Sequence, residues 1–209
     1  MVEAMSASDV TRAKPFLMMA LKINDLQMVQ GLVQRGYPIN EPCDGVTPLL
    51  FAAGVSNEQV VQTIIDAGAR LDATDSSGRN VLHFGCKSKN VAVFNVLNQR
   101  LQSAGLWDQL AEQRTAGGST PLMYAVQSGE AFMVRDCLNQ RMNPTKTDFI
   151  GVSCIDMAKQ FQGEVSSHIT RLLEQAIGTV TYSDDNSEAE AKYNQDPFNT
   201  FYQDRQAGQ

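Results

Sequence analysis

Gly45-Val46-Thr47-Pro48-Leu49 and Gly118-Ser119-Thr120-Pro121-Leu122 are two copies of one motif, Gly-x-Thr-Pro-Leu. Weaker copies stand at Gly78-Arg79-Asn80-Val81-Leu82 and Gly151-Val152-Ser153-Cys154-Ile155. The third residues of the four copies are 33, 40 and 33 residues apart. A period of about 33 residues is typical of stacked helical repeats. We therefore predict an all-α chain of repeated units rather than an enzyme with a single core.

The unit that begins at Thr47 shows what each repeat contains. Its hydroxyl can cap a helix, and Pro48 suits the first helical position, where the missing N–H removes no hydrogen bond. Apolar residues at helical spacing continue this helix, and a second helix is expected to begin near Glu58 and to end before Gly68. The polar stretch 70–79 predicts a projecting loop. One repeat is therefore a helix, a turn, a second helix and a loop.

The whole chain can be divided into repeats of this kind. Gly45 to Ala69 resembles the ankyrin repeat, whose pattern reads roughly Gly-x-Thr-Pro-Leu-His-x-Ala-Ala-x-x-Gly and then Val-x-x-Leu-Leu-x-x-Gly-Ala. His83 takes the family's histidine position, whereas Leu50 and Met123 replace it. The resemblance implies a solenoid of about five helix-turn-helix units, and a hydrogen bond of His83 within its repeat. We place the units at about 15–44, 45–77, 78–117, 118–150 and 151–178.

The third repeat departs from the pattern because it is seven residues longer than the others. The extra residues follow Leu97, and Leu101 and Leu110 indicate a lengthened second helix with a further apolar turn. This insertion carries Trp107, the single tryptophan of the chain. Tryptophan is enriched at interfaces, so Trp107 is a candidate contact residue, although it could instead pack back on the adjacent repeat.

The two ends of the chain differ from the repeats. Residues 1–14 are expected to form a polar lead or cap with a brief helix that Pro15 ends. Residues 179–209 carry six acids and two bases with few aliphatic residues, which is typical of a flexible acidic tail. Phe198, Phe201 and Tyr202 stand close together in this tail. Such aromatics suit a linear motif that docks on a partner, or they could fold back on this protein's own surface.

Composition excludes several classes of function. A net charge of −6 argues against nucleic acid and anionic membranes as main partners. No apolar run approaches the ~20 residues of a membrane span, and the N-terminus lacks the pattern of a secretory signal. The four cysteines form no CxxC pair, which favours small buried side chains in a reducing compartment over a metal site. We expect an intracellular, most simply cytoplasmic, protein, with organelle or cytoskeletal association left open.

Residue patterns for catalysis are also missing. No glycine-rich phosphate loop and no serine-, cysteine- or histidine-based nucleophile site stands in the sequence. Asp44, Asp75 and Asp148 recur in the loop before a repeat, which marks them as turn formers rather than as a catalytic pair. We therefore predict no enzyme activity, no catalytic residues, no cofactor, no metal and no small-molecule substrate.

The remaining interpretation is binding to other proteins through the concave face of the stack. Phe51, Phe84 and Tyr124 occupy the same position in three successive repeats, either as an exposed aromatic stripe or packed between repeats. The chain would then be a scaffold or interaction module; the alternatives are a permanent structural subunit of a large assembly and a substrate-recruiting adaptor for a ligase or phosphatase. The candidate contact residues are Asp44, Phe51, Ser77, Arg79, Phe84, Lys87, Trp107, Tyr124, Gln127, Phe198, Phe201 and Tyr202.

Overall fold

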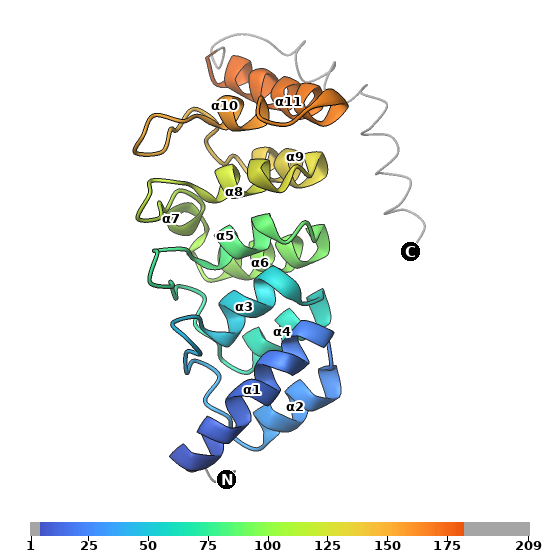
Figure 1. The fold of residues 1–209 in the computed structure, drawn as a ribbon, viewed down its shortest axis with the longest axis vertical. Helices are drawn as coiled ribbons and strands as arrows, with labels where there is room; N and C mark the ends of the chain where they lie inside the picture. The colour runs from blue at the N-terminus through green and yellow to red at the C-terminus, as the bar shows by residue number, and fades with distance from the viewer. Residues whose placement is uncertain (1–4, 182–209) are drawn as a thin grey trace.

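The structure, a computed structural model, describes residues 5–181, in which helices pair into a stack (Figure 1). The first helices of the pairs are α1 (Ala7–Ile23), α3 (Pro48–Val55), α5 (Val81–Lys87), α8 (Pro121–Ser128) and α10 (Cys154–Ala158). The second helices are α2 (Leu26–Gln34), α4 (Glu58–Asp66), α6 (Val91–Ser103), α9 (Ala131–Asn139) and α11 (Gly163–Thr181). A short extra helix, α7 (Trp107–Ala111), lies among the loops.

The pairs form two layers. The first helices contact one another in the series α1, α3, α5, α8 and α10, and the second helices in the series α2, α4, α6, α9 and α11. The loops that join successive pairs all project on one side of the stack (Figure 1). This arrangement confirms the all-α repeat fold that the motif spacing predicts.

The motif residues form the helix starts that the sequence predicts. The Thr47 hydroxyl accepts a hydrogen bond from the Leu50 amide at 3.4 Å, and Thr120 accepts one from Met123 at 3.5 Å. A proline follows each threonine within the first turn. A side-chain cap at an N-terminus stabilises a helix by about 1 kcal/mol, so the motif fixes where each first helix begins.

Small residues let the two layers approach each other. Ala52, Ala53 and Ala125 are fully buried. Gly85 takes the equivalent position in the third repeat, and a Cβ atom there would lie 2.8 Å from Leu97 Cδ1. A side chain at residue 85 would therefore have to displace the Leu97 methyl group.

The lengthened third repeat is confirmed. Helix α6 has 13 residues, whereas α4 and α9 have nine each. Leu97, Leu101 and Leu110 are all buried, the last on α7. The insertion therefore adds a helical turn and a further apolar layer to the core.

The expectation that Pro15 ends a brief helix is wrong. Helix α1 continues through Pro15 to Ile23. Proline removes one backbone hydrogen bond, but burial of apolar side chains on both sides of it holds the helix together. These buried side chains are Ala13, Leu17, Ala20 and Leu21.

Candidate functional site

The exposed side of the first-layer helices, which we call the inner-helix face, carries a row of apolar side chains with a few polar ones beside it. Its exposed members include Met19, Ile23 and Val55, with 60%, 57% and 43% of their surface accessible. The face consists of Met19, Lys22, Ile23, Phe51, Val55, Phe84, Lys87, Tyr124 and Gln127. Exposed apolar residues in a continuous row mark an interaction surface more often than isolated ones do.

The sequence interpretation missed Met19, Ile23 and Val55. The signal was present, because Met19 stands 32 residues before Phe51 and so occupies nearly the same repeat position as the aromatic stripe. The first repeat lacks the Gly-x-Thr-Pro-Leu motif, which hid this register. The structure supplies the register through the contact of α1 with α3.

The aromatic stripe combines the two alternatives that the sequence left open. Phe51, Phe84 and Tyr124 are half-buried and pack against the core. Phe84 Cδ1 lies 3.4 Å from the position that a Cβ atom on Gly54 would take, so Phe84 rests on the preceding repeat. The stripe is therefore held rigid by neighbouring repeats and still presents part of each ring to solvent.

Cations lie over the aromatic rings of the stripe. The Arg79 guanidinium is centred 4.8 Å from the Phe84 ring, and Lys87 Nζ lies 5.9 Å from the Tyr124 ring. Lys87 is the single charged residue within α3, α5 and α8. The central part of the face is therefore apolar and weakly cationic, which suits a partner segment with apolar and acidic side chains.

Arg79 is fixed by Asp75 in the adjoining loop. Asp75 Oδ1 accepts hydrogen bonds from the amides of Ser77 at 3.0 Å and Arg79 at 2.8 Å, and Oδ2 accepts from Arg79 Nε at 2.6 Å. Burial acts to raise the pKa of Asp75, but the bonds from Arg79 and Ser77 outweigh it and lower the pKa below its ordinary value. Asp75 is therefore the turn former that the sequence predicts.

Asp148 has the same role one repeat further on, since its Oδ1 accepts from the amides of Ile150 and Val152 at 3.1 and 2.9 Å. Asp44 is exposed in the loop before α3, with a left-handed φ of 49°. Ser77 is exposed, and its carbonyl oxygen accepts from the Ala116 amide of the next loop at 2.8 Å. Gln127 lies at the exposed end of α8, with Nε2 3.9 Å from Met157 Sδ.

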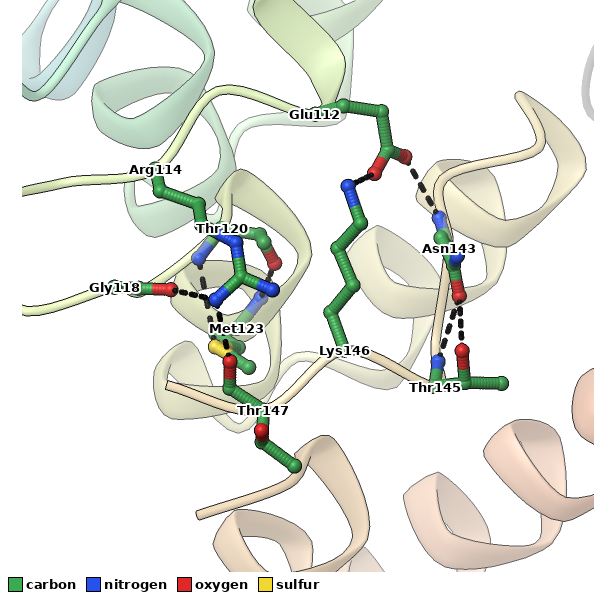
Figure 2. A network of polar contacts seen from close by, with 9 residues as sticks. All are labelled: Glu112, Arg114, Gly118, Thr120, Met123, Asn143, Thr145, Lys146 and Thr147. Atoms are coloured by element: carbon green, nitrogen blue, oxygen red, sulfur yellow. Dashed lines mark hydrogen bonds and ion pairs between the residues drawn. The ribbon is translucent and has the colours of Figure 1, made fainter. Parts of the chain in front are cut away.

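Neighbouring loops are linked by a polar network. Glu112 forms an ion pair with Lys146 and accepts a hydrogen bond from the Asn143 amide at 3.0 Å (Figure 2). Arg114 Nη1 donates to the carbonyl oxygens of Gly118 at 3.3 Å and Thr147 at 2.7 Å (Figure 2). The loop that follows the insertion therefore anchors the next loop along the stack.

This anchored loop carries two exposed apolar side chains that the sequence interpretation missed. Phe149 and Ile150 are 68% and 85% accessible. The equivalent loop positions in the second and third units hold Ser76-Ser77 and Ala116-Gly117, which are polar or small. The Phe149 amide donates to Gly117 O at 3.1 Å, and Arg114 lies over the ring at 5.9 Å. An alignment of the equivalent loops in the sequence would have singled out this apolar pair.

Gly118 shows how tightly these loops meet. It has a φ of +86°, and a Cβ atom there would lie 2.6 Å from the Phe149 amide nitrogen. The glycine of the motif is therefore needed both for its backbone conformation and for the close approach of the next loop.

Of the two alternatives left open for Trp107, the structure supports packing within the protein over an exposed contact residue. The Trp107 side chain is 8% accessible and packs edge-on against Phe94, with ring centroids 6.1 Å apart. The indole is buried because it closes the insertion over α6. Phe198, Phe201 and Tyr202 lie outside the described residues, so their role stays a prediction.

The buried polar residues of the third repeat connect it to the fourth. His83 Nδ1 accepts from the Asn80 amide at 3.2 Å, as expected within the repeat. Its Nε2 lies 3.2 Å from the Ser119 carbonyl oxygen and donates to it. Burial lowers the pKa of His83 to about 4, which keeps the imidazole neutral at pH 7.

Three cysteines, Cys86, Cys137 and Cys154, are buried. Cys86 and Cys137 lie with their sulfur atoms 3.5 Å apart, and burial raises the pKa of Cys137. Burial also raises the pKa of Cys154 to about 12. Within residues 5–181, no group of three or more His, Cys, Asp or Glu side chains is placed to hold a metal ion. In the same residues, no helix is both long and apolar enough to cross a membrane.

Comparison with known proteins agrees with this architecture. Residues 17–109 match the family model described as ankyrin repeats (3 copies). NF-kappa-B inhibitor delta of Mus musculus is 34% identical over 121 residues, which make up 56% of this chain and 34% of that protein. Mitochondrial disaggregase of Bos taurus is 29% identical over 150 residues, or 71% of this chain and 21% of that protein.

A third relative is the phosphocholine transferase AnkX of Legionella pneumophila, 29% identical over 112 residues, or 51% of this chain and 11% of that protein. The chain thus covers about a third or less of the length of these relatives. Ankyrin repeats are non-catalytic modules that typically bind other proteins. The repeat motif, the two-layer stack and the family match together show that the chain has the fold of an ankyrin-repeat solenoid and that residues 17–109 contain ankyrin repeats.

Proposed function

We propose that this chain is a non-catalytic interaction module or scaffold that binds partner proteins through the inner-helix face. The observation that carries the proposal is the row of exposed apolar side chains on that face, with Met19, Ile23 and Val55 most accessible. Half-buried aromatic rings continue the row along α3, α5 and α8. At protein interfaces a few residues supply most of the binding free energy, and aromatic side chains such as tyrosine are enriched among them.

The exposed pair Phe149 and Ile150 adds a second contact to the proposal. It stands on the loop side of the stack, on a loop fixed by Arg114 and Glu112. Because this loop is already ordered by hydrogen bonds, a partner would bind it with little loss of conformational entropy. A partner that reaches from the inner-helix face to this loop would contact three or more repeats.

The relatives fit the same proposal in part. NF-kappa-B inhibitor delta is, by its name, an inhibitor of another protein, and its matching region is similar to this chain. The transferase activity in the name of AnkX is not carried over, because the chain covers 11% of that protein. The partners of this chain would be other proteins, in an intracellular and most simply cytoplasmic setting.

Affinity purification of full-length variants tests the proposal. A face variant combines Phe84→Ala with Lys87→Glu, and a matched control combines Leu138→Ala with Arg35→Glu on second-layer helices. Leu138 and Phe84 are both half-buried, and Arg35 and Lys87 are both exposed. We expect quantitative mass spectrometry to show partners that the face variant loses and the control keeps. Equal loss or equal retention by both variants argues against the proposal.

Two other roles remain as alternatives. A permanent structural subunit of a cytoskeletal or multi-enzyme assembly would keep its partners through washing in high salt, because obligate interfaces are large and apolar. A substrate-recruiting adaptor for a ligase or phosphatase would bind two partners at two separate surfaces. The face variant would then lose one of the two partners and keep the other.

A further inference from the structure

The centre of the inner-helix face has an unbalanced charge. Helices α3, α5 and α8 together carry one charged residue, Lys87, which is exposed. Lys22 adds a second exposed cation at the end of α1. Asp75, in the loop before α5, is already paired with Arg79. The face therefore favours an occupant with apolar and acidic side chains.

The chain itself contains a segment of this chemistry. Residues 182–209 carry six acids and two bases, a net charge of −4, and the stretch 198–202 holds three aromatic residues. The repeats and the remaining residues account for −2 of the total charge of −6. Acidic and aromatic residues in one short stretch match the cationic and aromatic character of the face.

The segment is long enough to reach this face. Phe198 stands 17 residues after Thr181, the last residue of α11. An extended chain spans at most ~3.3–3.6 Å per residue, so this length reaches more than 50 Å. Helix α8 contacts both α10 and α5. Helix α5 therefore lies two helices away from α10, the first helix of the last repeat. Packed helices lie roughly 8–10 Å apart, so the distance to α5 is within reach.

We infer that residues 196–202 of this chain bind the inner-helix face of the same molecule. In this arrangement Phe198, Phe201 and Tyr202 pack against the stripe around Phe84 and Tyr124, and Asp196 lies near Lys87. A tethered segment has an effective concentration in the millimolar range, so a weak intrinsic affinity is enough to fill the face. The inference rests on the proposed use of the face, because the segment would compete with a partner protein for it.

Photo-crosslinking in the full chain tests the inference. A photoreactive phenylalanine replaces Phe201, and the protein is an equimolar mixture of ¹⁴N- and ¹⁵N-labelled copies. We expect adducts on peptides from α5 and α8 in which both ends carry the same isotope. Adducts between copies, adducts on second-layer helices or an absence of adducts on this face would overturn the inference.

Charge variants of the full chain make the test specific. Lys87→Glu should lower the yield of the adduct about fivefold, since it replaces an attraction by a repulsion. Arg35→Glu, at the end of the second-layer helix α2, should leave the yield unchanged. A rise in salt to about 1 M should also lower the yield, because exposed charges are then screened. Equal yields in both charge variants would contradict the role of Lys87.

The result can be separated from that of the proposed function. If adducts fall elsewhere while the face variant still loses its partners, the inference fails and the proposed function stands. If adducts fall on α5 and α8 while the face variant keeps every partner, the face is a site for the chain's own segment and the proposed function fails.

Discussion

His83 Nε2 donates a hydrogen bond to the carbonyl oxygen of Ser119 at 3.2 Å, and so joins a helix of the third repeat to the motif of the fourth. The imidazole edge also packs on the Tyr124 ring, with centroids 5.1 Å apart. Tyr124 belongs to the inner-helix face, so a buried contact between repeats helps to fix a ring that a partner would touch. Stability and the proposed binding surface are therefore linked through His83.

The low pKa of His83 predicts a pH-dependent stability. The folded protein keeps His83 neutral down to about pH 4, whereas the unfolded chain binds the proton below about pH 6.5. The contribution of the neutral imidazole is complete above pH 6.5 and is lost as pH falls toward 4. The loss amounts to about 3 kcal/mol in the free energy of unfolding.

Urea unfolding of the wild type and of His83→Gln measures this effect. Glutamine can keep a donor for Ser119 but does not titrate, so the variant should lose less stability than the wild type between pH 7.5 and 4.5. The comparison removes the contribution of the carboxylates, which both proteins share. The same pH dependence in both proteins would show that His83 is not the responsible group.

Asn80 stands where the repeat motif has threonine, yet we expect a change to threonine at this position to destabilise the protein. The Asn80 side-chain nitrogen donates to Leu110 O at 2.8 Å and to Gln113 Oε1 at 2.9 Å, and so holds the insertion. Asn80→Thr restores the residue of the motif but removes both donors, leaving buried acceptors without a partner. We expect the free energy of unfolding to fall by about 1–3 kcal/mol.

The matched control is Asn57→Thr. Asn57 caps α4 through its side-chain oxygen, which accepts from the Val60 amide at 3.0 Å, and threonine can replace it. We expect a change within about 0.5 kcal/mol, measured by chemical denaturation. A stabilised Asn80→Thr variant would mean that the insertion does not depend on this residue.

The cysteines should differ in reactivity. Cys86, Cys137 and Cys154 are buried, and the pKa values of Cys137 and Cys154 are raised by burial, whereas Cys43 is half-buried. A thiol reagent needs an accessible thiolate. Titration of the native protein should therefore give one fast-reacting thiol, and titration in denaturant should give all four. Two or more fast thiols in the native protein would contradict the packing of the core.

Phe149 and Ile150 should affect binding and leave the fold intact. Both side chains are largely exposed, so Phe149→Ser with Ile150→Ser should change the free energy of unfolding by less than about 0.5 kcal/mol per site. If the loop contacts the partner, the variant should retain less of it in affinity purification. The matched control is Ser76→Ala with Ser77→Ala in the earlier loop, and equal retention by both would exclude the Phe149 loop.

The sequence predicts the repeat fold because the residues that start and end each helix recur at a regular spacing. A cap at Thr47, a proline at residue 48 and a glycine at residue 68 each fix one local feature. Thr120 and Pro121 repeat the cap and the proline, and Ser153 repeats the cap. The continuation of α1 through Pro15 was missed because packing outweighs the local preference of proline. The burial of Trp107 was left open because it depends on how the insertion folds over Phe94.

The candidate surface is less predictable than the fold. The position of Phe51, Phe84 and Tyr124 follows from the repeat period, but their partial exposure depends on neighbours such as Gly54 and Arg79. The exposure of Phe149 and Ile150 depends on a loop held by residues of the preceding repeat. Such contacts join residues about 30 positions apart, which periodicity within one repeat cannot reveal.

The most direct measurement of the central claim is site-specific photo-crosslinking of the full chain to other proteins in cell extract. The photoreactive residue replaces Lys87 on the inner-helix face in one sample and Gln99 on the second-layer helix α6 in the other; both positions are exposed. Binding through the inner-helix face predicts a discrete adduct with a second protein from position 87 that position 99 does not form. Adducts from position 99 alone, or the same adducts from both positions, would contradict binding through the inner-helix face.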